Sequence, residues 1–505
     1  MSFQQGLSGL NGAAKSLDVI GNNIANASTV GFKGSQAQFA DVYANSLNGA
    51  GGNQAGIGVK VSQIAQQFTQ GNIEATNNPL DIAINGGGFF RTEVSGAVQY
   101  SRNGQFSLDK NGFVVNAQGA KLTGYTAGPS GAILAGSPVP ITINTADLKP
   151  VATTHVATEI NLDSGSAIPL TSPFNATDPT TYNKQTPIDV FDSLGNSHVM
   201  STYYVKTGGG AWDVYSAVDG VEITNQAVAA AAQTDPASQT ARTNFQTAAT
   251  TPPGNTAAEA IAYATAAGNA VRTAAAAAGA TPATQAAITA AATSAGTTVG
   301  INPDQIDLLI AAAVSVPAVR TGYLRFDTSG ALSSAAMAPE TLPLTISLPV
   351  FPPTGATAPL TLQMNFANST QFGSPTSEKK STQDGYTAGS LQRFSAGSDG
   401  IILGQYSNGQ SHALGQIVLS NFANPNGLSP LGNNAWAETS TSGVPLVGTP
   451  DSGSLGVLQS SAVENSNVDL TAELVNMITA QRVYQANAQT IKTQDSVLQT
   501  LVNLR

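Results

Sequence analysis

Apolar residues recur every three or four positions at both ends of the chain, which is the spacing of one face of an α-helix. The N-terminal series covers residues 3–24 and the C-terminal series covers residues 470–502, and neither contains proline. An isolated helix is marginally stable in water, so such stripes need a packing partner. We therefore expect the two ends to pair with each other or with copies of themselves. The expected assembly positions are Phe3, Leu7, Leu10, Ala14, Leu17, Ile24, Leu470, Leu474, Met477, Tyr484, Ala488, Ile491, Leu498 and Val502.

Between the ends, short β-type runs alternate with turn residues. Asn-Gly pairs at 85–86, 103–104 and 111–112 supply the positive φ angles of tight hairpins, so we expect an antiparallel β domain here. A second β region begins near residue 150, and a further Asn-Gly turn lies at 408–409. The expected strands are 81–84, 89–94, 106–108, 113–115, 122–125, 188–191, 199–205, 212–215, 321–326, 401–406 and 417–419, with more strand signal within 341–366.

The segment from about 226 to 315 is rich in alanine and threonine and has few large side chains. Alanine is the best helix former, and Thr281 and Asn302 each precede a proline, as a capping residue precedes a first-turn proline. We favour short helices, with 308–310 as their best-supported end. The alternative is a mobile low-complexity insertion, because small apolar groups bury little area.

These patterns predict a multidomain α+β protein with paired, coiled-coil-like terminal helices and mainly antiparallel β domains nested by insertion. Residues 1–47 and 466–505 would form the helical domain. Residues 48–146 and 366–465 would form an inner β domain that includes a Gly-rich connector at 48–58. Residues 147–365 would form an outer β domain that contains the Ala-rich insertion.

Composition and motifs argue against several classes of function. The formal net charge is −10, so the clustered cations that bind nucleic acid are missing. There is no cysteine, and we see no basic and apolar signal segment at the start and no run of about 20 apolar residues that would span a membrane. His155, His198 and His412 are isolated from one another along the sequence, and we find no enzyme signature. We therefore expect no enzyme activity, no metal and no cofactor.

Three separated motifs resemble the axial proteins of the bacterial flagellum, which form its rod and hook. Residues 22–33 read NNIANASTVGFK, residues 78–90 read NPLDIAINGGGFF, and the chain closes with ELVNMITAQRVYQANAQTIKTQDSVLQTLVNLR. Residues 186–219, with VFDSLGNSHVMSTYYVK, are similar to an outer domain of hook subunits that rod subunits lack. The motif positions are Asn22, Asn23, Asn26, Gly31, Phe32, Asn78, Pro79, Leu80, Asp81, Gly86, Gly88, Phe89, Phe90, Gln481, Arg482 and Asn487.

The resemblance implies a structural subunit that polymerises with itself into a curved, flexible tube, which couples the motor-driven rod to the filament for swimming motility. It implies as partners the distal rod, the hook cap, the hook-filament junction protein and the flagellar type III export apparatus. Its place would be the extracellular hook, reached without a cleaved signal peptide. Two alternatives stay open on the sequence: a distal rod subunit, and a secreted β-rich adhesin or surface protein.

Overall fold

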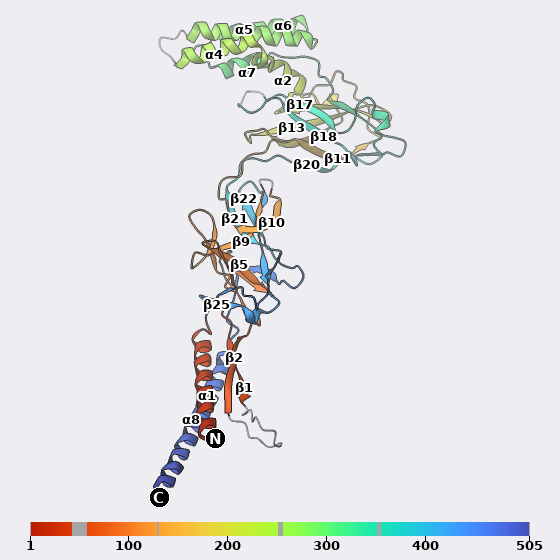
Figure 1. The fold of residues 1–505 in the computed structure, drawn as a ribbon. Coiled ribbons are helices and arrows are strands. Elements are labelled where there is room, and N and C mark those ends of the chain that lie inside the picture. Colours follow the sequence, from red (N-terminus) through yellow and green to blue (C-terminus); the bar gives the residue numbers. More distant parts are fainter. Residues whose placement is uncertain (1, 43–57, 129–130, 251–255, 351–354, 504–505) are drawn as a thin grey trace. The chain divides into compact units, whose positions relative to one another are not determined.

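The computed structural model describes residues 2–42, 58–128, 131–250, 256–350 and 355–503 (Figure 1). The chain forms two units: residues 1–146 together with 390–505, and residues 147–389. The expected boundary between inner and outer domains after residue 146 coincides with this division. The sequence analysis expected the chain to return from the outer to the inner domain at residue 366. This expectation is wrong, because residues 366–389 belong to the second unit.

In the first unit, the two terminal segments form helices α1 (Ser2–Ala25) and α8 (Leu470–Asn503), which lie side by side (Figure 1). Gly6 faces Ile491, whereas Asn23 contacts Glu473, so the two helices run antiparallel. A strand pair that the sequence did not indicate, β1 (Ser35–Val42) and β2 (Gly58–Gln66), packs on α1. Residues 35–42 are therefore strand and not part of a purely helical domain, and most of the expected connector lies outside the described residues.

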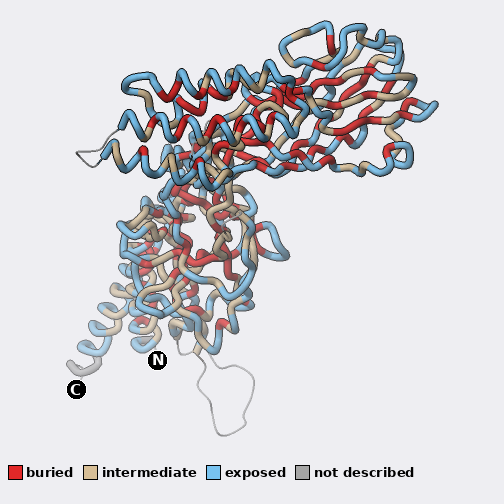
Figure 2. The backbone as a smooth tube through the Cα atoms, turned by 90° about the horizontal axis from the view of Figure 1, so that it is seen from above, coloured by how far each residue is buried: buried red, intermediate tan, exposed pale blue. Residues whose placement is uncertain are grey.

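The rest of the first unit is antiparallel β structure around a core that includes Ile82, Phe90, Leu122 and Ile417. Figure 2 shows buried stretches in these β regions and an exposed end of α8. The strands are β3 (Ile73–Ala75), β4 (Ile82–Asn85), β5 (Phe89–Val94), β6 (Ala97–Ser101), β7 (Phe106–Leu108), β8 (Val114–Asn116), β9 (Lys121–Ala127), β10 (Ile133–Pro140), β21 (Leu391–Ala396), β22 (Ile401–Tyr406), β23 (Ser411–Ile417), β24 (Leu419–Asn421), β25 (Ser429–Gly432), β26 (Ala435–Ala437), β27 (Leu446–Gly448), β28 (Val457–Ser460) and β29 (Ala462–Glu464).

Of the first three Asn-Gly pairs, only the pair at 111–112 joins two strands that pair with each other, β7 and β8. The pair at 103–104 has another role: a Cβ on Gly104 would lie 1.7 Å from the carbonyl oxygen of Ile82, so the close approach of another strand excludes any side chain. A tight hairpin that we missed turns at Ser95 and Gly96, with φ of 50° and 87°, between β5 and β6. Local turn residues therefore indicated bends in the chain better than they indicated which strands pair.

The β part of the second unit contains two five-stranded sheets over one apolar core that includes Trp212, Tyr204 and Phe366. β11 pairs with β18 and β19 in parallel and with β20 in antiparallel register. These pairings explain the corrected boundary, because β19 and β20 complete the sheet of β11. The strands are β11 (His155–Asp163), β12 (Lys184–Phe191), β13 (Ser197–Gly208), β14 (Ala211–Val218), β15 (Val221–Glu222), β16 (Gly322–Arg325), β17 (Leu344–Leu348), β18 (Leu360–Asn365), β19 (Thr370–Phe372) and β20 (Ser377–Gln383).

The Ala-rich segment is helical, as expected. Thr281 accepts a hydrogen bond from the backbone N–H of Thr284, and Asn302 forms a reciprocal capping box with Gln305, so both expected caps are confirmed. Alanines pack around Tyr263, Phe245, Ile288 and other larger residues, which supplies the core that the composition alone did not reveal. The helices are α2 (Ile223–Ala229), α3 (Ala231–Thr234), α4 (Pro236–Thr250), α5 (Thr256–Ala277), α6 (Pro282–Gly296) and α7 (Pro303–Ala311).

Small residues let α5 and α6 approach closely, and this contact makes a testable prediction. A Cβ placed on Gly268 would lie 2.4 Å from the Cβ of Ala292. Replacing Gly268 with valine should therefore destabilise the insertion by about 1 to 3 kcal/mol, because the helices must separate. The matched control is Ala262→Val on the exposed side of α5, which should cost less than about 1 kcal/mol. Chemical denaturation of the full chain measures both; equal losses would contradict close packing at Gly268.

Candidate assembly site

The contact between α1 and α8 is made through small residues of α1. A Cβ on Gly6 would lie 3.2 Å from Ile491, and one on Gly9 would lie 2.7 Å from the side chain of Asn487. Positions further along the same side of α1, including Ala13 and Ile20, are buried. The glycines therefore allow a close backbone approach near the start of α1, and the large side chains of Phe3 and Leu7 lie elsewhere on its surface.

The expected stripes flank this contact and leave large apolar side chains in solvent. Phe3 and Leu7 are each 44 % exposed, Leu474 is 45 % exposed, and Ile478, which the sequence analysis did not single out, is 52 % exposed. Helical periodicity places the α1 stripe and the Leu470, Leu474, Ile478 row on the same side of the pair. We call this surface the apolar face: Phe3, Leu7, Leu10, Ala14 and Leu17 of α1, and Leu470, Leu474, Met477, Ile478, Tyr484 and Ala488 of α8.

The other predicted stripe positions lie in the contact between α1 and α8, near the end of α1, or on the free end of α8. Ile491 lies in the contact with α1, and Ile24 is half-buried near the end of α1. Because Gly6 faces Ile491 in an antiparallel pair, α8 continues past the start of α1 (Figure 1). Leu498 lies on this projecting part and is 54 % exposed. Val502 is helical, but its side chain lies outside the described residues.

The end of α1 is tied to the start of α8 by the first sequence motif. Asn23 is buried; its side chain accepts the backbone N–H of Ser35 at 2.9 Å and donates to the Ser35 carbonyl at 2.8 Å and to Glu473 Oε1 at 3.3 Å. Asn26 donates from its side chain to the carbonyl and side-chain oxygens of Asn22, which closes the last turn of the helix. These motif residues have a positional role in the chain turn after α1.

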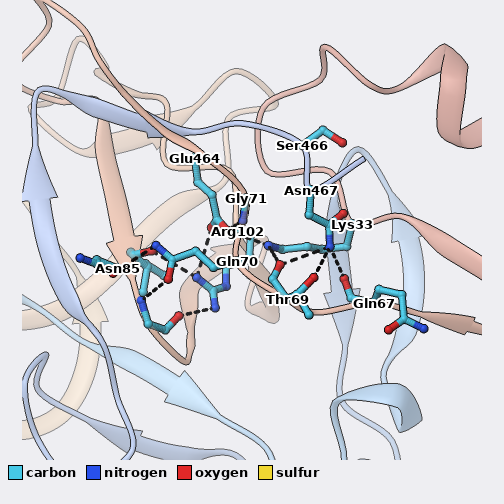
Figure 3. A network of polar contacts seen from close by, with 12 residues as sticks. Lys33, Gln67, Thr69, Gln70, Gly71, Asn85, Arg102, Glu464, Ser466 and Asn467 are labelled. Atoms are coloured by element: carbon cyan, nitrogen blue, oxygen red, sulfur yellow. Dashed lines mark hydrogen bonds and ion pairs between the residues drawn. The ribbon is translucent and has the colours of Figure 1, made fainter. Parts of the chain in front are cut away.

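A buried network of three charged side chains lies next to this turn (Figure 3). Lys33 Nζ lies 2.7 Å from Glu464 Oε1, and Arg102 Nη1 lies 3.1 Å from Glu464 Oε2. The side chains of Lys33 and Glu464 are fully buried, and that of Arg102 is 4 % exposed. Glu464 is thus the one carboxylate between two cations, and we call these three residues the charged triad.

Backbone groups complete the triad. Lys33 donates to the carbonyl of Thr69 at 2.7 Å, and Arg102 donates to the carbonyl of Gly86 at 2.7 Å. Glu464 Oε1 also accepts the backbone N–H of Gly71 at 2.9 Å, and the Glu464 carbonyl accepts the N–H of Gly31 at 2.7 Å. The triad therefore joins the turn after α1, the loop after β2, the inner β structure and the strand that precedes α8.

Burial is the largest influence on both cations of the triad and lowers the pKa of Lys33 and of Arg102 below their ordinary values. Contact with Glu464 opposes this effect at both residues, and the nearby charge of Arg102 further lowers the pKa of Lys33. The excess of one positive charge makes Glu464 the member whose loss leaves most charge uncompensated.

The remaining motif residues occupy two places. Asn78, Pro79, Leu80, Asp81, Gly86, Gly88, Phe89 and Phe90 build the inner β domain, where Leu80, Phe89 and Phe90 are buried and Asn78 donates to Asp81 at 3.0 Å. Gln481 and Arg482 are exposed on α8, and Asn487 faces Gly9. Sequence reasoning missed the triad: Lys33 closes the first motif and could have been noticed, whereas nothing local marks Arg102 or Glu464 as buried.

Within the described ranges, no group of three or more His, Asp or Glu side chains is placed to hold a metal ion, and no helix is long and apolar enough to cross a membrane. His198 lies 2.8 Å from Asp219, and His155 lies 3.1 Å from Asp384. Both contacts tie neighbouring segments of the second unit together.

Asp384 makes a pH-dependent contribution to the second unit. Burial alone would raise the pKa of Asp384, but hydrogen bonds from the Thr154 hydroxyl and from the backbone N–H groups of His155 and Thr154 lower it to about 2. A depressed pKa means that the carboxylate stabilises the fold above its unfolded value near 3.8 and that this gain is lost as the pH falls toward 2. Asp384→Asn should therefore cost at most about 1 kcal/mol at pH 7, since solvent screens the partly exposed group. Thermal unfolding at pH 7 and pH 2 checks this; a loss that persists at pH 2 would contradict it.

Four family models match the chain in the expected order. The model of the flagella basal body rod protein matches residues 3–33, and the flagellar hook protein FlgE/F/G D1 domain matches residues 83–164. The flagellar basal body protein FlaE D2 domain matches 161–308 and 283–386, and the flagellar basal body rod FlgEFG protein C-terminal model matches 459–504.

Full-length relatives decide the family. The flagellar hook protein FlgE of Salmonella typhimurium is 40 % identical over 509 residues, covering 100 % of both chains. The chain belongs to the flagellar hook protein family. The hook proteins FlgE of Escherichia coli and of Treponema pallidum are 39 % and 29 % identical and also cover 100 % of this chain. The chain is accordingly a structural subunit of the flagellar hook, and neither the distal rod subunit nor the adhesin is retained.

Proposed function

We propose that the chain polymerises with itself through the apolar face and the projecting end of α8. The observation that carries the proposal is the exposure of large apolar side chains in two orderly helical rows, although the same two helices already pack together through small residues. Contiguous exposed apolar surface of this kind marks a protein interaction site. The contact between α1 and α8 within one subunit leaves these apolar rows exposed, so neighbouring subunits can bury them.

The mechanical role follows from this arrangement. Axial helices buried between subunits would close the wall of a curved tube. All the β structure and the helical insertion lie between α1 and α8 along the sequence. The tube would couple the motor-driven rod to the filament and bend as it rotates. We infer a mechanical role without catalysis, with no cofactor.

By similarity to hook subunits, the further partners would be the distal rod, the hook cap, the hook-filament junction protein and the flagellar type III export apparatus. Export through that apparatus would place the subunit outside the cell without a cleaved signal peptide. The complete lack of cysteine suits a chain that must fold after export without disulfides.

Purified hook and basal-body complexes test the proposal. Antibodies against the helical insertion, residues 226–315, should detect the chain on immunoblots of the denatured complexes and place gold on the curved segment between rod and filament. A strain that lacks the chain should lose both signals and its hooks. Hooks that form normally in that strain, or purified hooks whose immunoblots lack the chain, would contradict the proposal.

A further inference from the structure

We infer that Glu464 is a positioning residue for assembly, which fixes the direction in which both terminal helices leave the inner β structure. This inference rests on the proposed role of the helices in polymerisation. Glu464 touches neither helix surface that would meet another subunit, so it acts through Lys33 and Arg102 and through the backbone. Glu464 is the last residue of β29, six positions before α8 begins.

Glu464 holds the segment that follows α1 and the segment that precedes α8 at one point. Its carbonyl binds Gly31 and its carboxylate binds Lys33, both in the turn that follows α1. The same carboxylate binds Arg102, which is anchored to the inner β structure through the carbonyl of Gly86 (Figure 3). One side chain therefore ties the end of the α1 segment and the start of the α8 segment to a rigid core.

Asn467 makes a second connection near the start of α8. Asn467 accepts the backbone N–H of Gly34 at 2.8 Å and donates to the carbonyl of Gln67 at 2.7 Å, so the last residues before α8 are bound to the segments on both sides of the β1 and β2 pair. Two separated points of attachment resist both tilting and twisting of the helix pair. Buried ionic groups with directional partners can select one geometry even where they add little net stability.

The test separates positioning from stability with two variants of the full chain. Glu464→Gln keeps the size of the side chain and an acceptor for Gly71 but removes the charge between the two cations. The triple variant K33M/R102M/E464Q also removes those cations, so no buried charge is left uncompensated. We expect Glu464→Gln to lower the yield of ordered polymers at least about tenfold, and the triple variant to recover thermal stability but not ordered assembly.

A distance measurement on the soluble chain gives a second readout that does not depend on polymers. The chain has no cysteine, so cysteines introduced at the exposed positions Gln118 and Gln489 can carry two spin labels, one on the inner β structure and one on α8. The inference predicts a narrow distance distribution in the parent chain and a broadened one in the triple variant.

An unchanged distribution, or ordered polymers of normal yield from the triple variant, would overturn the inference about Glu464. That result would leave the proposed function intact as long as charges placed on the apolar face still block assembly. Assembly that survives both kinds of change would instead reject the proposed function itself.

Discussion

The double variant L474D/I478D should lose the ability to polymerise while its soluble form stays folded. Both side chains are about half exposed in the single chain, so aspartate at these positions disturbs little within the subunit. In a polymer the exposed half of each side chain would be buried, which contributes about 0.7 to 1.5 kcal/mol per side chain. Losing both weakens one contact by about 2 kcal/mol, which is about thirtyfold in its equilibrium constant, and burying two carboxylates would weaken it further.

The matched control is L308D/L309D on α7 of the helical insertion. Leu308 and Leu309 are 46 % and 47 % exposed, so the control makes the same chemical change at similar exposure in the other unit. Sedimentation and electron microscopy of the purified chains measure polymer formation, and circular dichroism checks folding. The account predicts polymers from the control only; polymers from L474D/I478D at the normal yield would show that the apolar face is not the assembly surface.

Glu464→Gln should produce the largest loss of stability of any single change within the charged triad. It leaves Lys33 and Arg102 buried without a counter-ion, and breaking a buried ion pair in this way costs about 3 to 5 kcal/mol. Lys33→Met should cost clearly less, because Arg102 and Glu464 remain as a neutral pair. Arg102→Met leaves the other neutral pair and should behave like Lys33→Met, apart from the loss of its bond to Gly86.

Urea denaturation of the three single variants measures this order, with fluorescence from Trp436 as a probe of the first unit. Trp212 in the second unit is replaced by phenylalanine in all chains so that only one tryptophan reports. The triad account requires Glu464→Gln to be the least stable of the three. Equal losses from all three, or a larger loss from Lys33→Met, would contradict the charge balance that we assign to the triad.

The terminal helices could be predicted because their information is local. Periodicity from Phe3 to Ile24 and from Leu470 onward, without proline, specifies helix and marks the apolar rows. Periodicity alone did not reveal which face the two helices share. Gly6 and Gly9 set that face, because the lack of a side chain lets α8 approach the backbone of α1 closely. Only the structure shows the short distances from these glycines to Ile491 and Asn487.

The triad and the β1 and β2 pair could not be predicted for a different physical reason. Lys33 and Glu464 are 431 positions apart, so no local pattern can show that one neutralises the other. Residues 35–42, with the sequence SQAQFADV, contain few large apolar groups, and the strand they form depends on packing against α1. Strand pairing in the second unit likewise depended on β19 and β20 returning to β11, which moved the domain boundary.

The accessibility of one introduced thiol tests the central claim most directly. In this cysteine-free chain, Leu474→Cys should react rapidly with a maleimide in the soluble subunit and become protected in purified hooks. The control, Leu309→Cys on the helical insertion, reports any general loss of reactivity in the polymer. The account predicts that protection of position 474, relative to position 309, rises at least about tenfold on assembly. Equal reactivity of Leu474→Cys in subunits and in hooks would show that the apolar face stays open in the polymer and would contradict the account.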